Sequence, residues 1–388
     1  MAYRLSITLL GSAKILILFE LQNNCIYICN TPVIWNGMVS YFDNQHPAHR
    51  DKLIFRPEET SRLAEQIKEK SFTTLYSAPG FGKSILVNKA LGQLKDEGYP
   101  TTVVTLDLFN VTSAQALAGL YVKLFKKYID DYNKDALLPI RIDLDNVSLS
   151  IAVNLPNLLS SVTDINFVVW FKEFQNILQM EEGEKILKLM EKEMASHKDV
   201  AYIVTGEQLN KMKDIFEKKK FFYKINCNIP LGPLPKSDCI TYLRNGFLLS
   251  GKDLEMETAD AIYKTAGGYP KVINRLAAMC DSQALGYINK RILRGAVESY
   301  YNDNESAYRY TVGNLTANQV NFLKAVCDGA QKFSSAEVLK KYRLNSSANV
   351  FRLKEALSKK EIVTFDADDR ASIIDPMFEH WLKERYFK

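Results

Sequence analysis

Apolar residues follow two different periods along this chain. Four short runs of β-branched, aromatic and other apolar residues predict buried strands. Between them, and through most of the C-terminal half, apolar residues recur every three or four positions, as on the buried face of a helix. The strands are expected at 72–76, 101–107, 165–175 (ending in polar residues) and 199–206. Because strands and helices alternate, the pattern predicts an α/β fold with a parallel sheet covered by helices on both faces.

The second half of the chain is predicted to be helical. A proline-rich stretch at 230–235 separates it from the strands, which indicates a domain junction. Residues 129–162 show no clear period and are interpreted as an insertion with little regular structure. The expected helices are 237–249, 255–266, 271–281 and 287–300, followed by 316–330, 335–342 and 347–360, with a hairpin at 362–365 and 370–374.

Three helices followed by a hairpin are typical of a winged helix. The chain of 388 residues is too long for one ordinary core. We therefore predict an N-terminal extension of uncertain structure at 1–50, an α/β core at 51–232, a helical lid at 233–305 and a winged helix at 306–388.

Residues 1–37 differ from the rest of the chain. Lys14 interrupts the apolar run from Ile7 to Phe19, and Glu20 ends it, so the run is too short and too charged for a membrane span. An ordinary start follows at Met38. The hypothesis is that residues 1–37 are a non-native upstream extension or a loosely attached segment.

The loop after the first strand carries the main chemical signal. Residues 77–84 read Ser-Ala-Pro-Gly-Phe-Gly-Lys-Ser and match the end of the phosphate-binding pattern G-x-x-x-x-G-K-[ST], with Ser77 replacing the first glycine. Glycines allow backbone N–H groups to converge on a phosphate, and the helix that follows adds its positive end. A chance Gly-Lys-Ser in a surface turn would lack the strand before it and the helix after it.

We expect Lys83 to reach the β- and γ-phosphates of ATP and to face solvent without a ligand, and Ser84 to hold Mg²⁺. The predicted nucleotide-binding residues of this loop are Ser77, Ala78, Pro79, Gly80, Phe81, Gly82, Lys83, Ser84 and Ile85.

The third strand ends in Lys172 and Glu173. In phosphate-loop ATPases a buried strand ends in an acid that holds Mg²⁺ and a second acid that positions the attacking water. Glu173 fits the second role, although it could be a solvated strand-end residue. Lys172 stands where the metal-binding acid is expected, so either it supplies charge directly to the phosphates, with little turnover, or Asp107 provides the metal contact. Thr205, at the end of the fourth strand, is a candidate for contacting the γ-phosphate or its water, or is structural.

Composition changes this picture little. The net charge of +5 is small for the length, so any basic site must be local. Six cysteines without C-x-x-C pairs, and four scattered histidines, indicate neither a zinc site nor a disulfide framework. Reduced thiols in the cytoplasm, with no membrane partner, are the simplest interpretation. Residues 336–360 hold seven Lys and Arg against two Glu, which suits contact with double-stranded DNA or, equally, an unknown protein partner.

From about residue 50 to 388 the chain resembles the archaeal-type ATPases of the STAND/AAA+ group of P-loop NTPases. The resemblance rests on six motifs in the family's order, and Lys172 is the departure from it. The motifs are Phe55-Arg56-Pro57-Glu58-Glu59, the loop 77–84, Thr105-Leu-Asp107, Phe171-Lys-Glu-Phe-Gln175, Ala266-Gly-Gly-Tyr-Pro270 and Asp375-Pro-Met-Phe-Glu-His-Trp381.

The resemblance implies a nucleotide-binding core, a lid and a winged helix, with ATP on Lys83 and Ser84 beneath the segment 268–270. Tyr269 and Pro270 are then further nucleotide contacts, and the lid position depends on the nucleotide bound. The leading hypothesis is an ATP-binding switch with slow or absent hydrolysis. A DNA-binding initiator or regulator whose winged helix is oriented by ATP is the alternative, and a conventional ATPase is the third.

Overall fold

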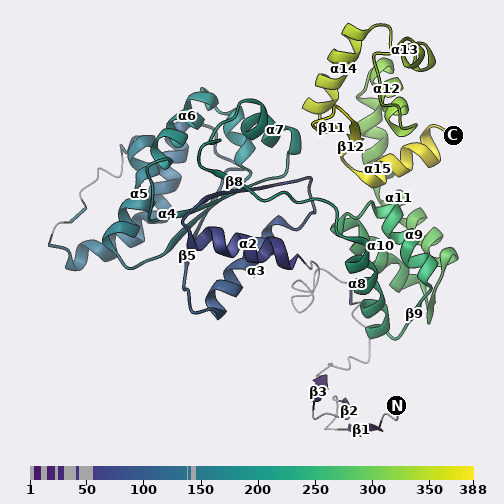
Figure 1. Ribbon diagram of the computed structural model, residues 1–388, viewed down its shortest axis with the longest axis horizontal. Helices are drawn as coiled ribbons and strands as arrows, with labels where there is room; N and C mark the ends of the chain where they lie inside the picture. Colours follow the sequence, from purple (N-terminus) through teal and green to yellow (C-terminus); the bar gives the residue numbers. More distant parts are fainter. Residues whose placement is uncertain are drawn as a thin grey trace.

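The structure, a computed structural model, describes residues 4–9, 15–21, 25–29, 41–42, 56–137, 139–140 and 146–388. It consists of an α/β core, a helical lid and a C-terminal winged helix, which lie side by side in Figure 1. Phe55, the first residue of the opening motif, lies outside the described residues.

The core is built on a parallel five-stranded sheet, as the sequence predicts. Its strand order is β5-β6-β7-β4-β8. The four predicted strands are confirmed within three residues at each end. The fifth strand, β8, has no apolar run and was not predicted. It pairs with β4, where the Thr74 hydroxyl donates to the side-chain oxygens of Asn226 at 2.9 Å and Asn228 at 3.1 Å. The strands are β4 (Phe72–Tyr76), β5 (Thr102–Asp107), β6 (Phe167–Lys172), β7 (Ala201–Gly206) and β8 (Asn226–Asn228).

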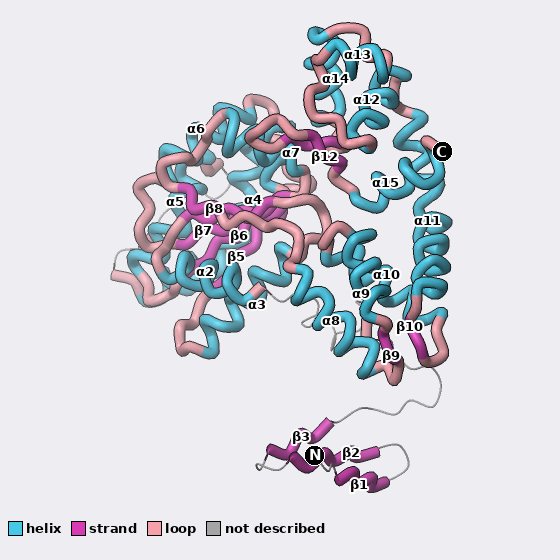
Figure 2. Tube along the Cα trace, turned by 45° about the vertical axis from the view of Figure 1, so that its right-hand side comes forward, coloured by secondary structure: helices cyan, strands magenta, loops and turns pink. Residues whose placement is uncertain are grey.

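Helices cover both faces of this sheet (Figure 2). On one face, α2 (Pro57–Lys68) and α3 (Lys83–Asp96) bury their apolar residues against β4, β6 and β7. The opposite face is covered by a larger cluster, to which more helices contribute. Those helices are α4 (Ala114–Asp135), α5 (Leu149–Val162), α6 (Gly183–Met194) and the short α7 (Leu209–Lys213), with a 3₁₀ turn at Phe174–Gln179 and a π turn at Asp214–Lys218.

The interpretation of residues 129–162 as an irregular insertion is wrong for most of that stretch. Helix α4 continues to Asp135, and α5 occupies Leu149–Val162. Helix α5 has no charged residue and contains Pro156, which disfavours a helix interior, so the sequence gives only a weak helical signal. It forms because Ala152, Leu155 and Leu159 are buried in the core cluster beside α4 and α6.

The lid is helical, as predicted, and ends in a longer helix than expected. The expected helix at 287–300 begins at Lys290 and runs to Gly313, so it leaves the lid and enters the winged helix. Phe42 is buried in the lid, where it packs against Phe247, and its carbonyl accepts a hydrogen bond from the Asn274 side chain at 2.8 Å. The lid elements are α8 (Lys236–Leu249), α9 (Met256–Ala266), α10 (Pro270–Gln283), α11 (Lys290–Gly313) and the parallel pair β9 (Asp253–Leu254) and β10 (Tyr287–Ile288).

The winged helix is confirmed element by element, with one further helix after the hairpin. A capping box at Thr316 and Gln319 begins its first helix, as the sequence indicates. Its elements are α12 (Ala317–Cys327), α13 (Ala336–Tyr342), α14 (Ser347–Lys359), the antiparallel β11 (Val363–Phe365) and β12 (Ala371–Ile373), α15 (Pro376–Trp381) and a π turn at Leu382–Tyr386.

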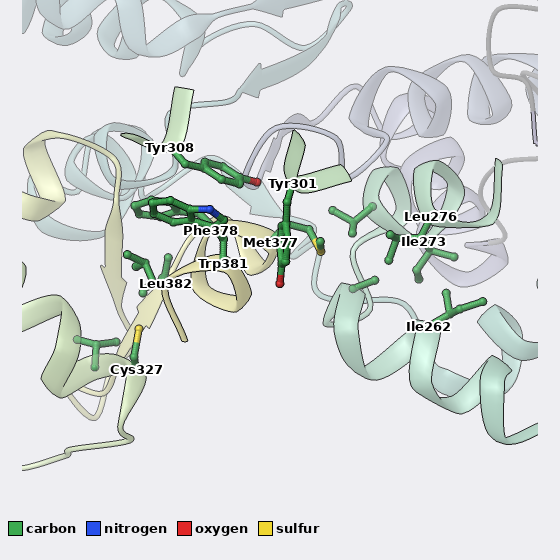
Figure 3. Close-up of a cluster of buried hydrophobic side chains, with 14 of the residues drawn as sticks. Ile262, Ile273, Leu276, Tyr301, Tyr308, Cys327, Met377, Phe378, Trp381 and Leu382 are labelled. Carbon is green, nitrogen blue, oxygen red and sulfur yellow. The ribbon is translucent and has the colours of Figure 1, made fainter. Parts of the chain in front are cut away.

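The lid and the winged helix share one hydrophobic core. Figure 3 shows Met377, Phe378 and Trp381 of α15 beside Tyr301 and Tyr308 of α11, in the same cluster as residues from α9 and α10. The α/β core has separate clusters on its two faces. Because a shared core resists relative movement, the lid and the winged helix are expected to move together.

Three short strands lie near the N-terminus: β1 (Arg4–Leu9), β2 (Ile15–Leu21) and β3 (Cys25–Cys29), paired antiparallel in that order. The hypothesis that residues 1–37 are non-native or loosely attached stays a prediction, and the rest of that segment lies outside the described residues. Within the part of the chain that the structure describes, the helices are all too short or too polar to span a membrane.

Candidate nucleotide-binding site

The predicted phosphate loop joins β4 to the N-terminus of α3. Because β4 lies between β7 and β8, the loop stands at the carboxyl end of an inner strand. Gly80 and Gly82 both have φ of +83°, which L side chains rarely adopt. A Cβ on Gly80 would also lie 2.7 Å from Cβ of Lys271 in the lid. Both glycines are therefore required by the loop conformation, and Gly80 also by the close approach of the lid.

Lys83 is held inside this loop. Its ammonium donates to the carbonyl oxygens of Ser77 and Ala78, each at 3.1 Å, and lies 3.3 Å from the Ser77 hydroxyl. Only 5% of the side chain is exposed, so the expectation that it faces solvent without a ligand is wrong. The reason is the loop itself, which curls around the ammonium and supplies carbonyl acceptors.

Two carboxylates act on Lys83. Glu207, in the loop after β7, has its Oε1 3.9 Å from the Lys83 Nζ. Burial lowers the pKa of Lys83 from its ordinary value to about 8, while Glu207 and then Glu173 act in the opposite direction. Lys83 is therefore charged at neutral pH and loses its proton in mildly alkaline solution.

We expect ATP affinity to fall as the pH rises above about 8. A bound phosphate stabilises the ammonium and raises the pKa of Lys83, so binding above that pH must take up a proton. The dissociation constant should rise by up to about tenfold per pH unit, and stay nearly constant between pH ~7 and 8 because the last phosphate pKa is near 6. Titration calorimetry from pH 7 to 9.5, in two buffers with different heats of ionisation, measures the affinity and the proton uptake. A constant affinity with no proton uptake up to pH 9.5 would contradict the prediction.

Ser84 and Ile85 follow Lys83 in the first turn of α3. The Ser84 side chain is exposed and Ile85 is half-buried. The exposed hydroxyl at the helix N-terminus has the position that the Mg²⁺ prediction requires, but groups of three or more potential acidic, His or Cys ligands do not occur among the described residues. Metal binding by Ser84 and Asp107 therefore stays a prediction.

The end of β6 holds Lys172 and Glu173 side by side in sequence but in different environments. The Lys172 ammonium lies over the Trp170 ring, 4.3 Å from its centroid, in a cation–π contact. Glu173 has a positive φ of 52°, and its Oε2 accepts from the Gln175 side chain at 2.6 Å. Asp107, directly opposite Lys172 in the β5–β6 register, is exposed and accepts from the Phe109 N–H at 3.0 Å. The structure thus brings all three predicted residues to the same edge of the sheet.

Thr205 is buried at the end of β7. Its hydroxyl donates to the carbonyl of Phe171 at 2.9 Å and accepts from the Trp170 indole N–H at 3.0 Å. Both contacts hold neighbouring strands together, which is the structural alternative that the sequence left open. A contact of Thr205 with the γ-phosphate or its water stays a prediction.

The lid covers the phosphate loop, as the resemblance implies. The Tyr269 ring meets the Phe81 ring edge-on, with centroids 4.5 Å apart, and the Lys271 N–H donates to the Gly80 carbonyl at 3.3 Å. Pro270 is buried at the start of α10. Ile374 of the winged helix completes a small apolar cluster with Ala78 and Phe81. The loop is therefore contacted by both C-terminal units.

A cavity of about 830 Å³ lies between the core and these units. It is large enough for a nucleotide-sized ligand. Its walls come from Pro79 of the phosphate loop, the residues that follow β6 and β7, helix α11 and the winged helix. The lining residues are Pro79, Glu173, Glu207, Gln208, Tyr308, Tyr310, Thr311, Asn314, Leu315, Lys360, Glu361, Ile362, Ile374, Asp375 and Phe378.

Comparisons with known proteins agree with this architecture. Residues 306–384 match the family described as "Probable winged helix domain". The Walker-type ATPase of Pyrococcus abyssi is structurally similar, with a TM-score of 0.62, 18% sequence identity, and coverage of 88% of this chain and 99% of that chain. The ORC2 protein of Aeropyrum pernix, in its ADPNP–ADP complexes, is similar with a TM-score of 0.53 and 14% sequence identity, over 90% of this chain and 98% of that chain. No curated protein matches the chain.

The fold is that of a P-loop ATPase with a C-terminal winged helix. Within this ATPase fold, sequence reasoning identified the phosphate loop, the end of β6 and the lid segment, and the structure brings them together. It missed the contribution of the winged helix to the cavity, above all Glu361 and Asp375. In the sequence Asp375 stands out only as part of a family motif. In the structure it is the N-cap of α15, its carboxylate accepts from the Met377 N–H at 2.9 Å, and burial raises the pKa of that carboxyl.

Glu207 was missed as well, although it follows a strand end two positions after Thr205. Parallel strands place their carboxyl ends at one edge of a sheet, so an acid directly after β7 could have been recognised as a neighbour of the phosphate loop. Glu361 gave no comparable signal, because its proximity to the cavity depends on how the winged helix docks on the α/β core.

Proposed function

We propose that this protein is an ATP-binding switch of the STAND/AAA+ type, in which the nucleotide sets the position of the lid and the winged helix. The observation that supports it most is the contact of the phosphate loop with both C-terminal units. Gly80 accepts a hydrogen bond from Lys271 of the lid, and Ile374 of the winged helix packs on Ala78 and Phe81. A nucleotide that reshapes this loop must therefore change its contacts with both units.

The connection between the two bodies supports movement of the lid and winged helix as one unit. Leu231 belongs to a core cluster and Leu234 to the lid cluster, so the chain crosses from one body to the other over Gly232 and Pro233. The Arg56 guanidinium donates to the Gly232 carbonyl at 2.5 Å and holds this crossing on the core side. A change at the phosphate loop would rotate the lid about this short segment.

We infer ATP and ADP as the ligands, with Mg²⁺ and hydrolysis less important than in a conventional ATPase. The Aeropyrum pernix ORC2 protein is described in complexes with ADPNP and ADP, which supports an adenine nucleotide in this fold. Lys172 at the end of β6 argues against a strongly bound Mg²⁺. Glu173 would position the attacking water where turnover occurs.

The test is titration of the full chain with ATP and ADP, with and without Mg²⁺, followed by phosphate release and small-angle X-ray scattering. The proposal predicts binding of both nucleotides, slow phosphate release, and scattering profiles that differ between ATP and ADP. Binding of both nucleotides with identical scattering profiles would contradict the switch, and absence of nucleotide binding would contradict the whole proposal.

The thiols support a reducing compartment, and we infer a cytoplasmic location. Cys227, Cys239, Cys280 and Cys327 are free, and three of them are buried. Burial raises the pKa of the thiols of Cys239, Cys280 and Cys327 to about 12, so they are unreactive packing residues.

A second candidate function is DNA binding through the winged helix, with ATP setting its orientation. Lys340, Lys341, Arg343 and Arg352 are exposed along α13, the turn and α14. Two further cations of the same stretch, Lys354 and Lys359, form ion pairs with Asp369 and Glu355. The charge available to a phosphate backbone is thus smaller than the sequence count suggests. A protein partner is the competing interpretation of this surface.

If this surface binds duplex DNA, the full-chain double variant Arg343→Ala/Arg352→Ala should bind it more weakly and with less salt dependence. Each lost phosphate contact lowers the slope of log affinity against log salt by about 0.9, so the slope should fall by about 1–2. Fluorescence anisotropy of a labelled duplex over a salt series measures this. Lys188→Ala/Lys192→Ala, on exposed positions of α6, removes the same charge as a control. Equal slopes for both variants, or no binding at low salt, would favour the protein partner.

A further inference from the structure

The winged helix is attached to the core at α7 by a charged cap. The Glu361 carboxylate accepts from the backbone N–H groups of Asn210 and Lys211, each at 3.0 Å, at the N-terminal end of α7. Glu361 belongs to the turn between α14 and β11. Burial raises the pKa of its carboxyl, while the two N–H groups act in the opposite direction. The cap therefore joins the helix after β7 to the turn before the wing.

Side chains of α7 add further bonds to the same part of the winged helix. The Asn210 amide donates to the carbonyls of Ser358 at 3.0 Å and Val363 at 2.9 Å. The Lys213 ammonium donates to the Phe365 carbonyl at 2.8 Å and lies 3.1 Å from the Thr364 hydroxyl. Figure 2 shows α7 beside the hairpin that these residues belong to. We call these bonds, with the Glu361 cap, the α7 contact.

The α7 contact begins three residues after the carboxylate that faces Lys83. Glu207 follows Gly206 at the end of β7, and α7 begins at Leu209. Gly206 packs closely against α7, because a Cβ there would lie 2.4 Å from the Met212 sulfur and 2.5 Å from the Gln175 side-chain oxygen. Met212 is fully buried in the core cluster. A displacement of this loop is therefore transmitted to α7.

We propose that Glu207 is the positioning residue that couples phosphate at Lys83 to the docking of the winged helix on α7. This inference rests on the proposed nucleotide switch and identifies the residue through which it acts. A nucleotide phosphate and the Glu207 carboxylate compete for one ammonium, and a phosphate carries more negative charge at more oxygens. When the phosphate wins, Glu207 is repelled and the loop 207–208 moves. The N–H groups of Asn210 and Lys211 then no longer converge on Glu361, and the α7 contact loosens.

Amide hydrogen exchange of the full chain reads this contact directly, because two of its bonds are made by backbone N–H groups. Exchange in 209–213 is compared with and without saturating ATP, alongside ATP affinity by calorimetry, at pH 6.5 so that Lys83 stays protonated. We expect ATP to accelerate exchange in 209–213 of the wild type by roughly tenfold, the equivalent of one charge-assisted hydrogen bond.

Glu207→Gln keeps the size of the side chain and removes the charge that competes with phosphate. We expect ATP to bind it roughly three- to tenfold more tightly, and exchange in 209–213 to respond to ATP by less than about twofold. Glu65→Gln, at an exposed position of α2, removes one charge elsewhere and should behave as the wild type. Glu361→Gln, which weakens the cap itself, should show fast exchange in 209–213 without ATP.

The outcomes separate this inference from the proposed function. If the wild type binds no nucleotide, the proposed function fails. If it binds ATP and exchange in 209–213 does not change, the switch does not act through α7 and the inference fails alone. The inference also fails if Glu207→Gln shows the full wild-type acceleration at unchanged ATP affinity.

Discussion

Lys83→Ala should reduce ATP affinity by about one to two orders of magnitude, or more. The substitution removes a charge-assisted contact with the β- and γ-phosphates, worth on the order of 1.5–3 kcal/mol or more. Lys83 is buried by the loop, with its ammonium already among the carbonyls of Ser77 and Ala78. The charge is therefore preorganised at the site, and its loss is not compensated by another side chain of the loop. Titration calorimetry of the variant with ATP and ADP measures the change.

The same burial requires a control for the fold, because Lys83 packs within the loop. The melting temperature and circular dichroism of Lys83→Ala should stay close to those of the wild type, since α3 keeps its apolar face of Leu86, Val87 and Ala90. Lys95→Ala, at the exposed far end of α3, should bind ATP normally. Unchanged ATP affinity in a folded Lys83→Ala protein would overturn the nucleotide site.

The sequence predicted the sheet and the phosphate loop because their signals are local. Buried parallel strands are continuous apolar runs, and β4, β6 and β7 are buried along almost their whole length. The loop needs glycines with positive φ, and only a few residue patterns satisfy this. The helices of the winged helix have capping side chains at Thr316, Ser335 and Ser346, which mark their starts in the sequence.

Features that depend on contacts between distant segments could not be predicted in this way. Helix α5 contains Pro156 and leaves Ile151 and Leu158 exposed. Its Ser150 and Asn154 side chains donate to Glu193 of α6, so burial in this helix does not follow its apolar pattern. The burial of Lys83 depends on the curl of its own loop, and the contact of Ile374 with that loop depends on how the two bodies dock. Of the residues that line the cavity, the sequence pointed to Pro79 and Glu173 alone as site residues. The arrangement that brings Glu361 to α7 is a property of the fold.

Lys172 is where the site departs most from a conventional ATPase. Its ammonium is fixed over Trp170, whose indole N–H donates to Thr205 on the next strand. Asp107 lies opposite in the register of β5 and β6. Lys172 therefore places a cation at this edge of the sheet, beside the carboxylate in which β5 ends. A Mg²⁺ ion at this edge would lie close to a like charge.

Lys172→Asp should increase both the Mg²⁺ dependence of ATP binding and the rate of hydrolysis. If the ammonium stands within about 4 Å of the metal position, its repulsion is roughly 4 kcal/mol for each pair of unit charges at an effective dielectric near 20. Mg²⁺ should then add little to ATP affinity in the natural protein. The aspartate removes that repulsion and supplies the missing contact, directly or through water.

Phosphate release is measured with and without Mg²⁺ for the wild type, Lys172→Asp and Lys172→Asp/Glu173→Gln. The double variant should lose the gain in turnover, because Glu173 positions the water. Lys172→Gln removes the positive charge without adding a ligand, and should relieve the repulsion but gain little turnover. A wild type that hydrolyses ATP briskly with Mg²⁺, and gains nothing from Lys172→Asp, would show that another acid holds the metal, and Asp107 would be the residue to replace.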